Sequence, residues 1–300
     1  MTTIAKCEEL ERSALAVRVL NSQTRTFHRN SPHQQSWPQL ACRNVELGRA
    51  AANDLVENSS CACDAVALPI PLDLADPKSI AAAAKWVEEE YDNNNDNGQQ
   101  GGGGGAILDV LVNNAAVHFN DPPLYGRVEY TPFEWQADVT VKTNYFGMLD
   151  ATRSFLPLLK RPPSPRIINV ASAAGRLTIL RSQTLVDAFT SEELTMPELS
   201  KLTTQFVKDA NDGTHAEQGW PNTCYGLSKV GVIAMPWVLA RQHPEMMINS
   251  VDPGYCKTDQ NNDQGVVDPA NGAYTPYLLA QMERENEGGG GVEGENECRQ

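Results

Sequence analysis

The first 47 residues of this 300-residue chain contain no glycine. Glycine lets a backbone approach a phosphate closely at a tight turn, so this segment cannot form a glycine-rich phosphate-binding loop. From Arg12 to Arg43 the chain also has no aspartate or glutamate. An acid-poor segment that bears arginine and serine is typical of organelle transit peptides, but three glutamates (Glu8, Glu9 and Glu11) precede it and weaken that match. We expect an irregular segment, with a transit peptide as the alternative.

Clustered positive charge and long apolar runs are lacking as well. Lysine and arginine number 24 against 38 aspartates and glutamates, which gives a net charge of −14. So negative a chain is poorly suited to nucleic acid or an anionic membrane surface as its main partner. No stretch approaches the roughly 18 apolar residues of a transmembrane helix. Six of the glutamates lie in the stretch 283–300, which we expect to be a disordered acidic tail.

The seven cysteines show no metal-binding pattern. Their number is odd, none belongs to a Cys-x-x-Cys pair, and Cys61 with Cys63 is too isolated to make a tetrahedral site. We therefore expect no bound metal and free, reduced thiols. Reduced thiols are typical of a reducing compartment, so we expect a cytoplasmic protein, with organelle import as the alternative that the N-terminus leaves open.

The rest of the chain alternates between short apolar runs and longer segments with helical periodicity. Buried strands are predicted at Ala65 to Leu72, Ile107 to Val112, Arg166 to Ala171 and Met247 to Val251. Helices are predicted at Asn44 to Glu57, Asp76 to Tyr91, Val139 to Leu159 and Thr223 to Gln242. Such alternation is typical of βαβ units, so we predict an α/β fold whose parallel sheet is covered by helices on both faces. The stretch 93–105, rich in asparagine and glycine, is predicted to be a flexible surface loop.

Tyr225 and Lys229 are the first pair of residues that suggests chemistry. Residues four apart share one face of a helix, so the phenol and the ammonium can converge. A nearby cation lowers the pKa of a phenol from its usual value of about 10, and such a phenol is a usable general acid. The Tyr-x-x-x-Lys spacing alone occurs by chance in many helices, so it needs support from other residues.

Further polar residues follow the ends of the predicted strands. Asn113 lies where the second strand ends, Ser172 follows the third, and the Pro-Gly turn at 253–254 follows the fourth, with Thr258 just beyond it. Asn144 is a polar residue inside a predicted helix. Ligands of open parallel sheets bind beyond the carboxyl ends of the strands, so we expect these residues to gather there.

Together these motifs resemble the short-chain dehydrogenase/reductase family, and within it the monomeric NADPH-dependent carbonyl reductases. The resemblance runs from about Leu40 to Ala280, and its particular marks are the stretches 41–48, 142–147 and 217–221 and an insert at 190–219. It implies a Rossmann-type, doubly wound parallel sheet over 40–282. It also implies hydride transfer from NADPH to an aldehyde, ketone or quinone. In that subfamily the insert covers the surface that other members use to oligomerise, which implies a monomer.

The resemblance also implies roles for individual residues. Tyr225 would donate the proton to the substrate carbonyl, Lys229 would assist it and bond the nicotinamide ribose, and Ser172 would polarise the carbonyl oxygen. Asn144 would bend its helix and hold a water that links Lys229 to solvent. Arg43 would pair with the 2′-phosphate that distinguishes NADP from NAD. The remaining cofactor contacts would come from Asp73 at the adenine ring, Asn113 at the adenine ribose, and Pro253, Gly254, Cys256 and Thr258 at the nicotinamide carboxamide.

Two features depart from the family pattern. A first strand and a Thr-Gly-x-x-x-Gly-x-Gly turn are expected about 25 residues before Arg43, but they are absent. The stretch 14–20 could mimic the strand, but 21–26 cannot replace the glycines. We therefore expect the sheet to lack a central strand, and interpret 1–39 as an irregular segment. The second departure is Pro236, which lies inside a predicted helix and is expected to kink it.

The sequence thus predicts an NADPH-dependent carbonyl reductase that acts on a small molecule. Two explanations of the N-terminus remain open: a wrongly assembled first exon, or a genuine relative that has lost the cofactor site. The second explanation leads to the alternative function, a catalytically silent Rossmann-like binding or scaffold protein.

Overall fold

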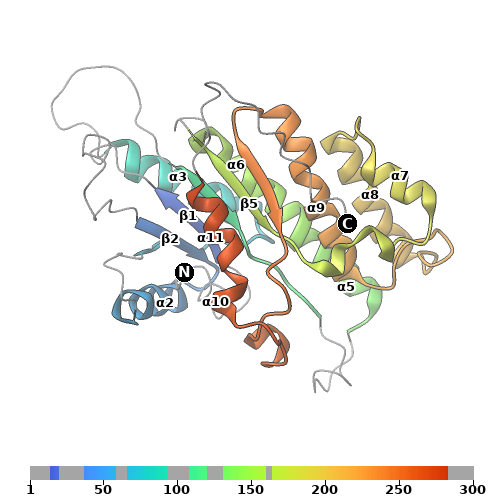
Figure 1. The fold of residues 1–300 in the computed structure, drawn as a ribbon, viewed down its shortest axis with the longest axis horizontal. Coiled ribbons are helices and arrows are strands. Elements are labelled where there is room, and N and C mark those ends of the chain that lie inside the picture. The colour runs from blue at the N-terminus through green and yellow to red at the C-terminus, as the bar shows by residue number, and fades with distance from the viewer. Residues whose placement is uncertain are drawn as a thin grey trace.

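Six strands form one sheet in the computed structural model, which describes residues 14–19, 37–58, 66–93, 108–119, 131–159 and 164–282. The strands are β1 (Ala14–Val19), β2 (Trp37–Cys42), β3 (Val66–Ala67), β4 (Val110–Asn113), β5 (Arg166–Val170) and β6 (Met247–Val251). Their order is β3-β2-β1-β4-β5-β6, and the neighbours β2 and β1 are labelled in Figure 1. This is the order of a doubly wound Rossmann sheet, so the predicted fold class is confirmed.

The central strand β1 runs against its neighbours. It pairs antiparallel with β2 and with β4, whereas β2 with β3, β4 with β5 and β5 with β6 are all parallel. The expectation that the sheet lacks a central strand is therefore wrong, because the residues 14–19 occupy that place. The reason is that the gap between β2 and β4 leaves two rows of backbone hydrogen-bonding groups, and a strand in either direction can pair with them.

Helices cover both faces of the sheet. On one face, α2 (Val45–Asn58) and α11 (Tyr274–Gln281) pack through Ala51 and Ala280 against a core that contains Val110 and Ile168. The opposite face packs Leu111 and Ile167 against α3 (Pro77–Asn93) and α6 (Met148–Leu159). Every residue of β4 and β5 is buried, as expected for strands covered on both sides.

The longest helical stretch joins α5 (Phe133–Val141), the π-helix η2 (Lys142–Gly147) and α6. It begins six residues before the predicted start at Val139. The other long helix, α9 (Cys224–Gln242), continues as one helix through the buried Pro236. Strand β3 is much shorter than the predicted run 65–72, because only two of its residues pair with β2.

The insert at 190–219 contains the helix α8 (Met196–Asn211), which follows α7 (Gln183–Thr190). A capping box fixes the start of α8: the Thr195 side chain accepts from the Glu198 N–H, and the Glu198 carboxylate accepts from the Thr195 N–H. The insert is fastened at its other end, where the indole of Trp220 donates to Asp209 at 2.7 Å. Helix α8 packs against α5 and α9, so the insert covers both helices.

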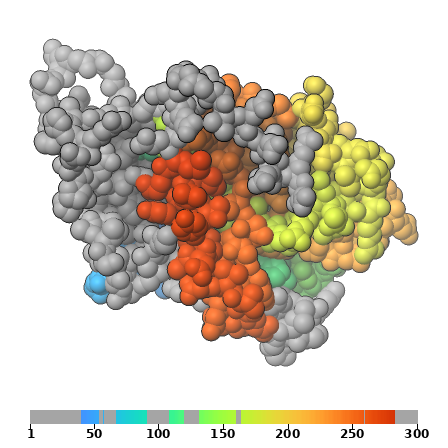
Figure 2. Space-filling view, in the orientation of Figure 1, coloured from blue at the N-terminus to red at the C-terminus, as the bar shows by residue number. Residues whose placement is uncertain are grey.

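The chain after β6 lies at the surface in the middle of one face of the molecule. Figure 2 shows this segment in orange and red across the centre of the view, ending in α10 (Pro269–Gly272) and α11. The helices of the described ranges are either too short or too polar to cross a bilayer. The predicted loop at 93–105, apart from Asn93 at the end of α3, and the predicted tail at 283–300 lie outside the described residues.

Candidate active site

Tyr225 and Lys229 lie one turn apart at the start of α9. The side chain of Thr223 begins this helix by accepting a hydrogen bond from the N–H of Gly226 at 3.0 Å. The ammonium nitrogen of Lys229 lies 5.5 Å from the ring centroid of Tyr225. It is almost fully buried and donates to the carbonyl of Val170 at 2.7 Å. A buried cation held at this distance from a phenol stabilises the phenolate form.

Ser172 is placed beside α9 by the turn that follows β5. Its hydroxyl oxygen caps the short helix η3 (Ala173–Gly175) by accepting from the N–H of Ala174 at 3.2 Å. Gly175 contacts the backbone of Lys229 so closely that a Cβ would lie 2.6 Å from the Lys229 carbonyl carbon. A glycine is therefore required there, and the close contact holds η3 and Ser172 against the helix that carries Tyr225.

Asn144 lies in the π-helix and is completely buried. Its amide makes two bonds to the backbone of Val117: the oxygen accepts from the N–H at 2.7 Å, and the nitrogen donates to the carbonyl at 2.9 Å. The same nitrogen lies 3.0 Å from the hydroxyl oxygen of Ser228, which donates to the carbonyl of Tyr225. Asn144 thus connects the segment after β4 to α9. A π-helix inside an α-helix is often found at a functional site.

His118 is a neighbour of Tyr225 that the sequence analysis missed. The two rings lie with their centroids 4.6 Å apart and their planes at 49°. No motif marks this histidine, because it follows β4 in an irregular segment and meets Tyr225 only through the fold. The two bonds from Asn144 to Val117 fix the residue immediately before it.

The four residues predicted at the nicotinamide lie in the loop that follows β6. Gly254 has φ +82°, a conformation that favours glycine, and its N–H donates to the side chain of Asp252 at 3.0 Å. Cys256 and Thr258 are buried within this loop, whereas Pro253 is half-buried. The thiol of Cys256 lies 3.4 Å from the carbonyl of Pro253, so it supports the loop from inside.

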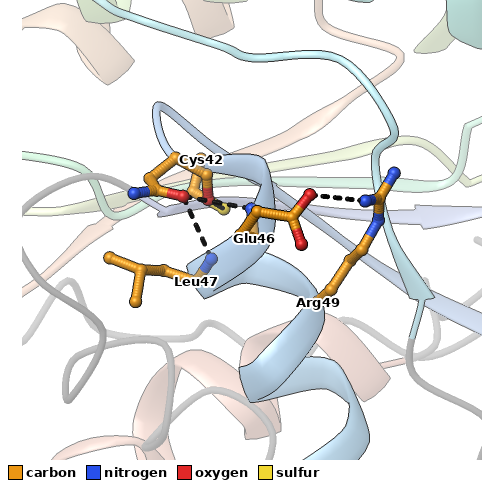
Figure 3. A network of polar contacts seen from close by, with 5 residues as sticks. Cys42, Glu46, Leu47 and Arg49 are labelled. Atoms are coloured by element: carbon orange, nitrogen blue, oxygen red, sulfur yellow. Dashed lines mark hydrogen bonds and ion pairs between the residues drawn. The ribbon is translucent and has the colours of Figure 1, made fainter.

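Arg43 directly follows β2 and is exposed. The turn that carries it is fixed by Asn44, whose side-chain oxygen accepts from the N–H groups of Glu46 and Leu47 at 3.0 and 3.1 Å (Figure 3). Arg49, on the same helix, pairs with Glu46 at 2.7 Å (Figure 3). Arg43 therefore stands at the carboxyl end of β2, separate from this ion pair.

Asp73 and Asn113 are both engaged within the fold. The carboxylate of Asp73 accepts from the N–H of Ala75 at 2.9 Å in the turn before α3. Asn113 is buried, and its amide nitrogen donates to Thr152 at 3.0 Å and to Asn169 at 2.8 Å. A contact between Asn113 and an adenine ribose stays a prediction, and the side chain would have to leave these bonds to make it.

The residues that lie at the cofactor edge of the sheet fit the nicotinamide half of a dinucleotide cofactor. Tyr225, Lys229, Ser172 and the loop 253–258 lie beyond the carboxyl ends of β5 and β6, where a nicotinamide ring would be held. The pyrophosphate half does not fit, because the reversed β1 ends at Val19, opposite Trp37 at the start of β2. The chain therefore leaves β1 at the far edge of the sheet. Among the described residues no glycine turn follows β1 at the cofactor edge.

A family model for short chain dehydrogenases matches residues 39–183. Mouse carbonyl reductase [NADPH] 1 is 40% identical over 190 residues, which cover 60% of this chain and 65% of that protein. Mouse carbonyl reductase [NADPH] 3 is 36% identical over 70% of this chain and 71% of its own length. The structure of salutaridine reductase from Papaver somniferum superposes with a TM-score of 0.66 at 25% identity, over 82% of this chain and 87% of that one.

The match to the first of these relatives spans slightly less than two thirds of its length. The match to the second spans more than two thirds of its length, at 36% identity. The strand order, the Tyr-Lys pair on α9 and the sequence relatives agree with one another. The chain therefore belongs to the short chain dehydrogenase family.

Proposed function

We propose that this protein reduces aldehyde or ketone carbonyls with NADPH, and that Tyr225 donates the proton. The observation that carries the proposal is the position of Lys229, whose ammonium lies 5.5 Å from the Tyr225 ring and is held by the Val170 carbonyl. Two relatives that bear the name carbonyl reductase [NADPH] support the choice of reaction and cofactor.

The residues of this chain have separate tasks in such a reaction. NADPH, when bound, supplies the hydride to the carbonyl carbon. Ser172 donates a hydrogen bond to the carbonyl oxygen and stabilises the negative charge that develops there. Tyr225 then transfers its phenolic proton to that oxygen, and the charge of Lys229 stabilises the phenolate that remains.

The cofactor is proposed to be NADPH rather than NADH because Arg43 is available at the carboxyl end of β2. A planar guanidinium can form two charge-assisted hydrogen bonds with a phosphate, and these are stronger than neutral hydrogen bonds. The loop 253–258 and Lys229 would hold the nicotinamide end. Asn144 would also hold the water that was predicted from the family resemblance.

We also propose that the protein is a monomer of the cytoplasm. The packing of α8 against α5 and α9 supports the monomer, because helix faces that are already covered cannot pair with a second copy. The three cysteines described by the structure, Cys42, Cys224 and Cys256, are free thiols, which supports a reducing compartment.

The experiment is to measure NADPH oxidation with a panel of aldehydes and ketones for the wild type and for Tyr225→Phe. We expect kcat to fall by about 100-fold or more, the usual scale for lost general acid catalysis. Tyr274→Phe, at an exposed position on α11, is the matched control and should keep full activity. Near-normal turnover by Tyr225→Phe would contradict the proposed role of the phenol. A wild type that turns over no carbonyl would favour the silent binding protein.

A further inference from the structure

We propose that His118 is a further titratable group of the active site, whose charge sets how strong an acid Tyr225 is. The inference rests on the proposed function, since it concerns the proton donor of that reaction. It starts from the contact between the two rings, whose centroids lie 4.6 Å apart.

The fold holds His118 in this place from two directions. The amide of Asn144 bonds both backbone groups of Val117, so the chain immediately before His118 is clamped to η2. The following residue, Phe119, packs edge-on against Trp135 of α5 with centroids 5.3 Å apart. His118 itself is only partly buried, so its imidazole can exchange a proton with solvent.

Lys229 approaches the same phenol, with its ammonium 5.5 Å from the ring centroid. Besides Tyr225 itself, α9 brings the ammonium of Lys229 to this ring pair. From η2 comes the amide of Asn144 and from β5 the carbonyl of Val170, and neither group titrates. On α5, Glu134 is the charged residue nearest in sequence to Trp135, and on η2 Lys142 is the one nearest to Asn144. Both are exposed to solvent.

An imidazole has an ordinary pKa of about 6.5, so its charge changes within the physiological range. When protonated, it adds a second positive charge beside the phenol and favours the phenolate. The phenolic O–H bond then breaks more readily, and its proton passes to the alkoxide formed from the carbonyl. His118 keeps its own proton throughout this step. The imidazolium and the Lys229 ammonium both stabilise the negative charge left on Tyr225.

Two variants separate the charge of His118 from its bulk. His118→Phe keeps an aromatic ring against Tyr225 but cannot be protonated, whereas His118→Ala removes both ring and charge. The matched control is His215→Phe. His215 also stacks on an aromatic ring, with its centroid 4.5 Å from that of Phe133, but it lies in the turn after α8.

The experiment measures kcat/KM for carbonyl reduction from about pH 5 to pH 8, the range in which histidine titrates. We expect the ratio of wild type to His118→Phe to be about threefold larger at the acid end. This magnitude is a small part of the roughly 100-fold or more that general acid catalysis contributes, because His118 acts only through Tyr225. The ratio for His215→Phe should stay constant. A constant ratio for His118→Phe would overturn the proposal.

A second measurement does not depend on turnover. In the NMR spectrum of the protein without cofactor, we expect the Tyr225 ring protons to shift with pH at the midpoint of the His118 imidazole, and to lose that step in His118→Phe. Comparison with Tyr225→Phe identifies the Tyr225 signals. An imidazole that does not titrate in this range, or a Tyr225 ring that does not follow it, would overturn the proposal. An inactive wild type that still shows the shared midpoint would contradict the proposed function and support the coupling of the two rings.

Discussion

Leu15 lies opposite Asn113 in an antiparallel pair at the centre of the sheet, although β4, to which Asn113 belongs, runs parallel to β5 on its other side. The pair fixes the direction of β1 relative to the whole sheet. Its first residue, Ala14, lies opposite Cys42 at the cofactor edge, and its last, Val19, lies opposite Trp37 at the far edge. The sheet thus keeps its six strands, but its central strand ends at the edge far from the site.

Lys229→Ala is expected to lower kcat by about 100-fold or more, on the scale of other losses in acid–base catalysis. It should also weaken the binding of NADPH, because the same ammonium is proposed to bond the nicotinamide ribose. Steady-state kinetics with varied NADPH measures both effects. Lys142→Ala, at an exposed position on η2, is the control. A variant with normal kcat and raised KM would contradict a role for Lys229 beside Tyr225.

Arg43→Ala is expected to raise the KM for NADPH by roughly 10-fold or more, because hydrogen bonds to charged groups contribute about 1.5–3 kcal/mol. The KM for NADH should not change, since NADH lacks the 2′-phosphate. Arg49→Ala is a close control on the neighbouring turn of α2, where the guanidinium already pairs with Glu46. Equal use of NADH and NADPH by the wild type would show that Arg43 does not select the cofactor.

Several parts of this structure follow from local sequence. The bounds of β6 match the prediction, and those of β5 and α9 differ from it by one residue at one end, because their apolar runs and capping residues are local signals. Tyr225 and Lys229 lie together because helical spacing alone puts them on one face.

Other parts depend on contacts between distant segments. The direction of β1 depends on which neighbours it pairs with, and the short apolar run 14–19 is equally suited to both directions. The burial of Asn113 results from bonds to Thr152 and Asn169, which belong to other elements. The contact between His118 and Tyr225 depends on the bonds by which Asn144 holds the segment after β4.

Asn144→Ala is expected to destabilise the fold as well as the site. The change leaves the N–H and carbonyl of Val117 without their partners, and each unsatisfied group costs about 1–3 kcal/mol. Urea denaturation should show a lower free energy of unfolding. Asn211→Ala, which removes exposed bonds to the carbonyl of Val207 and to the carboxylate of Asp138, should change it little. Equal free energies of unfolding for the two variants would contradict the role of Asn144 in holding the backbone of Val117.

Cys224 is expected to make the fold less stable in alkaline solution. Burial raises the pKa of its thiol from 9.0 to about 12, so the folded protein retains a proton that the unfolded chain releases above pH 9. The contribution of this thiol to the free energy of unfolding is fully present below pH 9. It is lost as the pH rises towards 12, by at most about 1.4 kcal/mol per pH unit. Cys224→Ala removes this contribution, so its thermal unfolding curve should depend less on pH in that window. Identical dependence in both proteins would contradict the buried, neutral thiol.

The reversed β1 is expected to weaken the binding of NADPH. A glycine turn after a parallel first strand would give the pyrophosphate several backbone N–H groups, each charge-assisted bond contributing about 1.5–3 kcal/mol. Loss of two such bonds lowers the affinity by roughly 100-fold or more. The contacts proposed for Lys229, Arg43 and the loop 253–258 remain.

Titration of nicotinamide fluorescence tests this expectation, with reduced nicotinamide mononucleotide as the comparison because it lacks the pyrophosphate and the adenosine. NADPH should bind only about 10-fold more tightly than the mononucleotide, which is the contribution of Arg43 alone. Arg43→Ala should remove that difference, whereas Arg49→Ala should preserve it. Turnover would then require NADPH well above micromolar concentrations. Saturable micromolar binding of NADPH would show that other residues hold the pyrophosphate and that the direction of β1 does not limit the cofactor site.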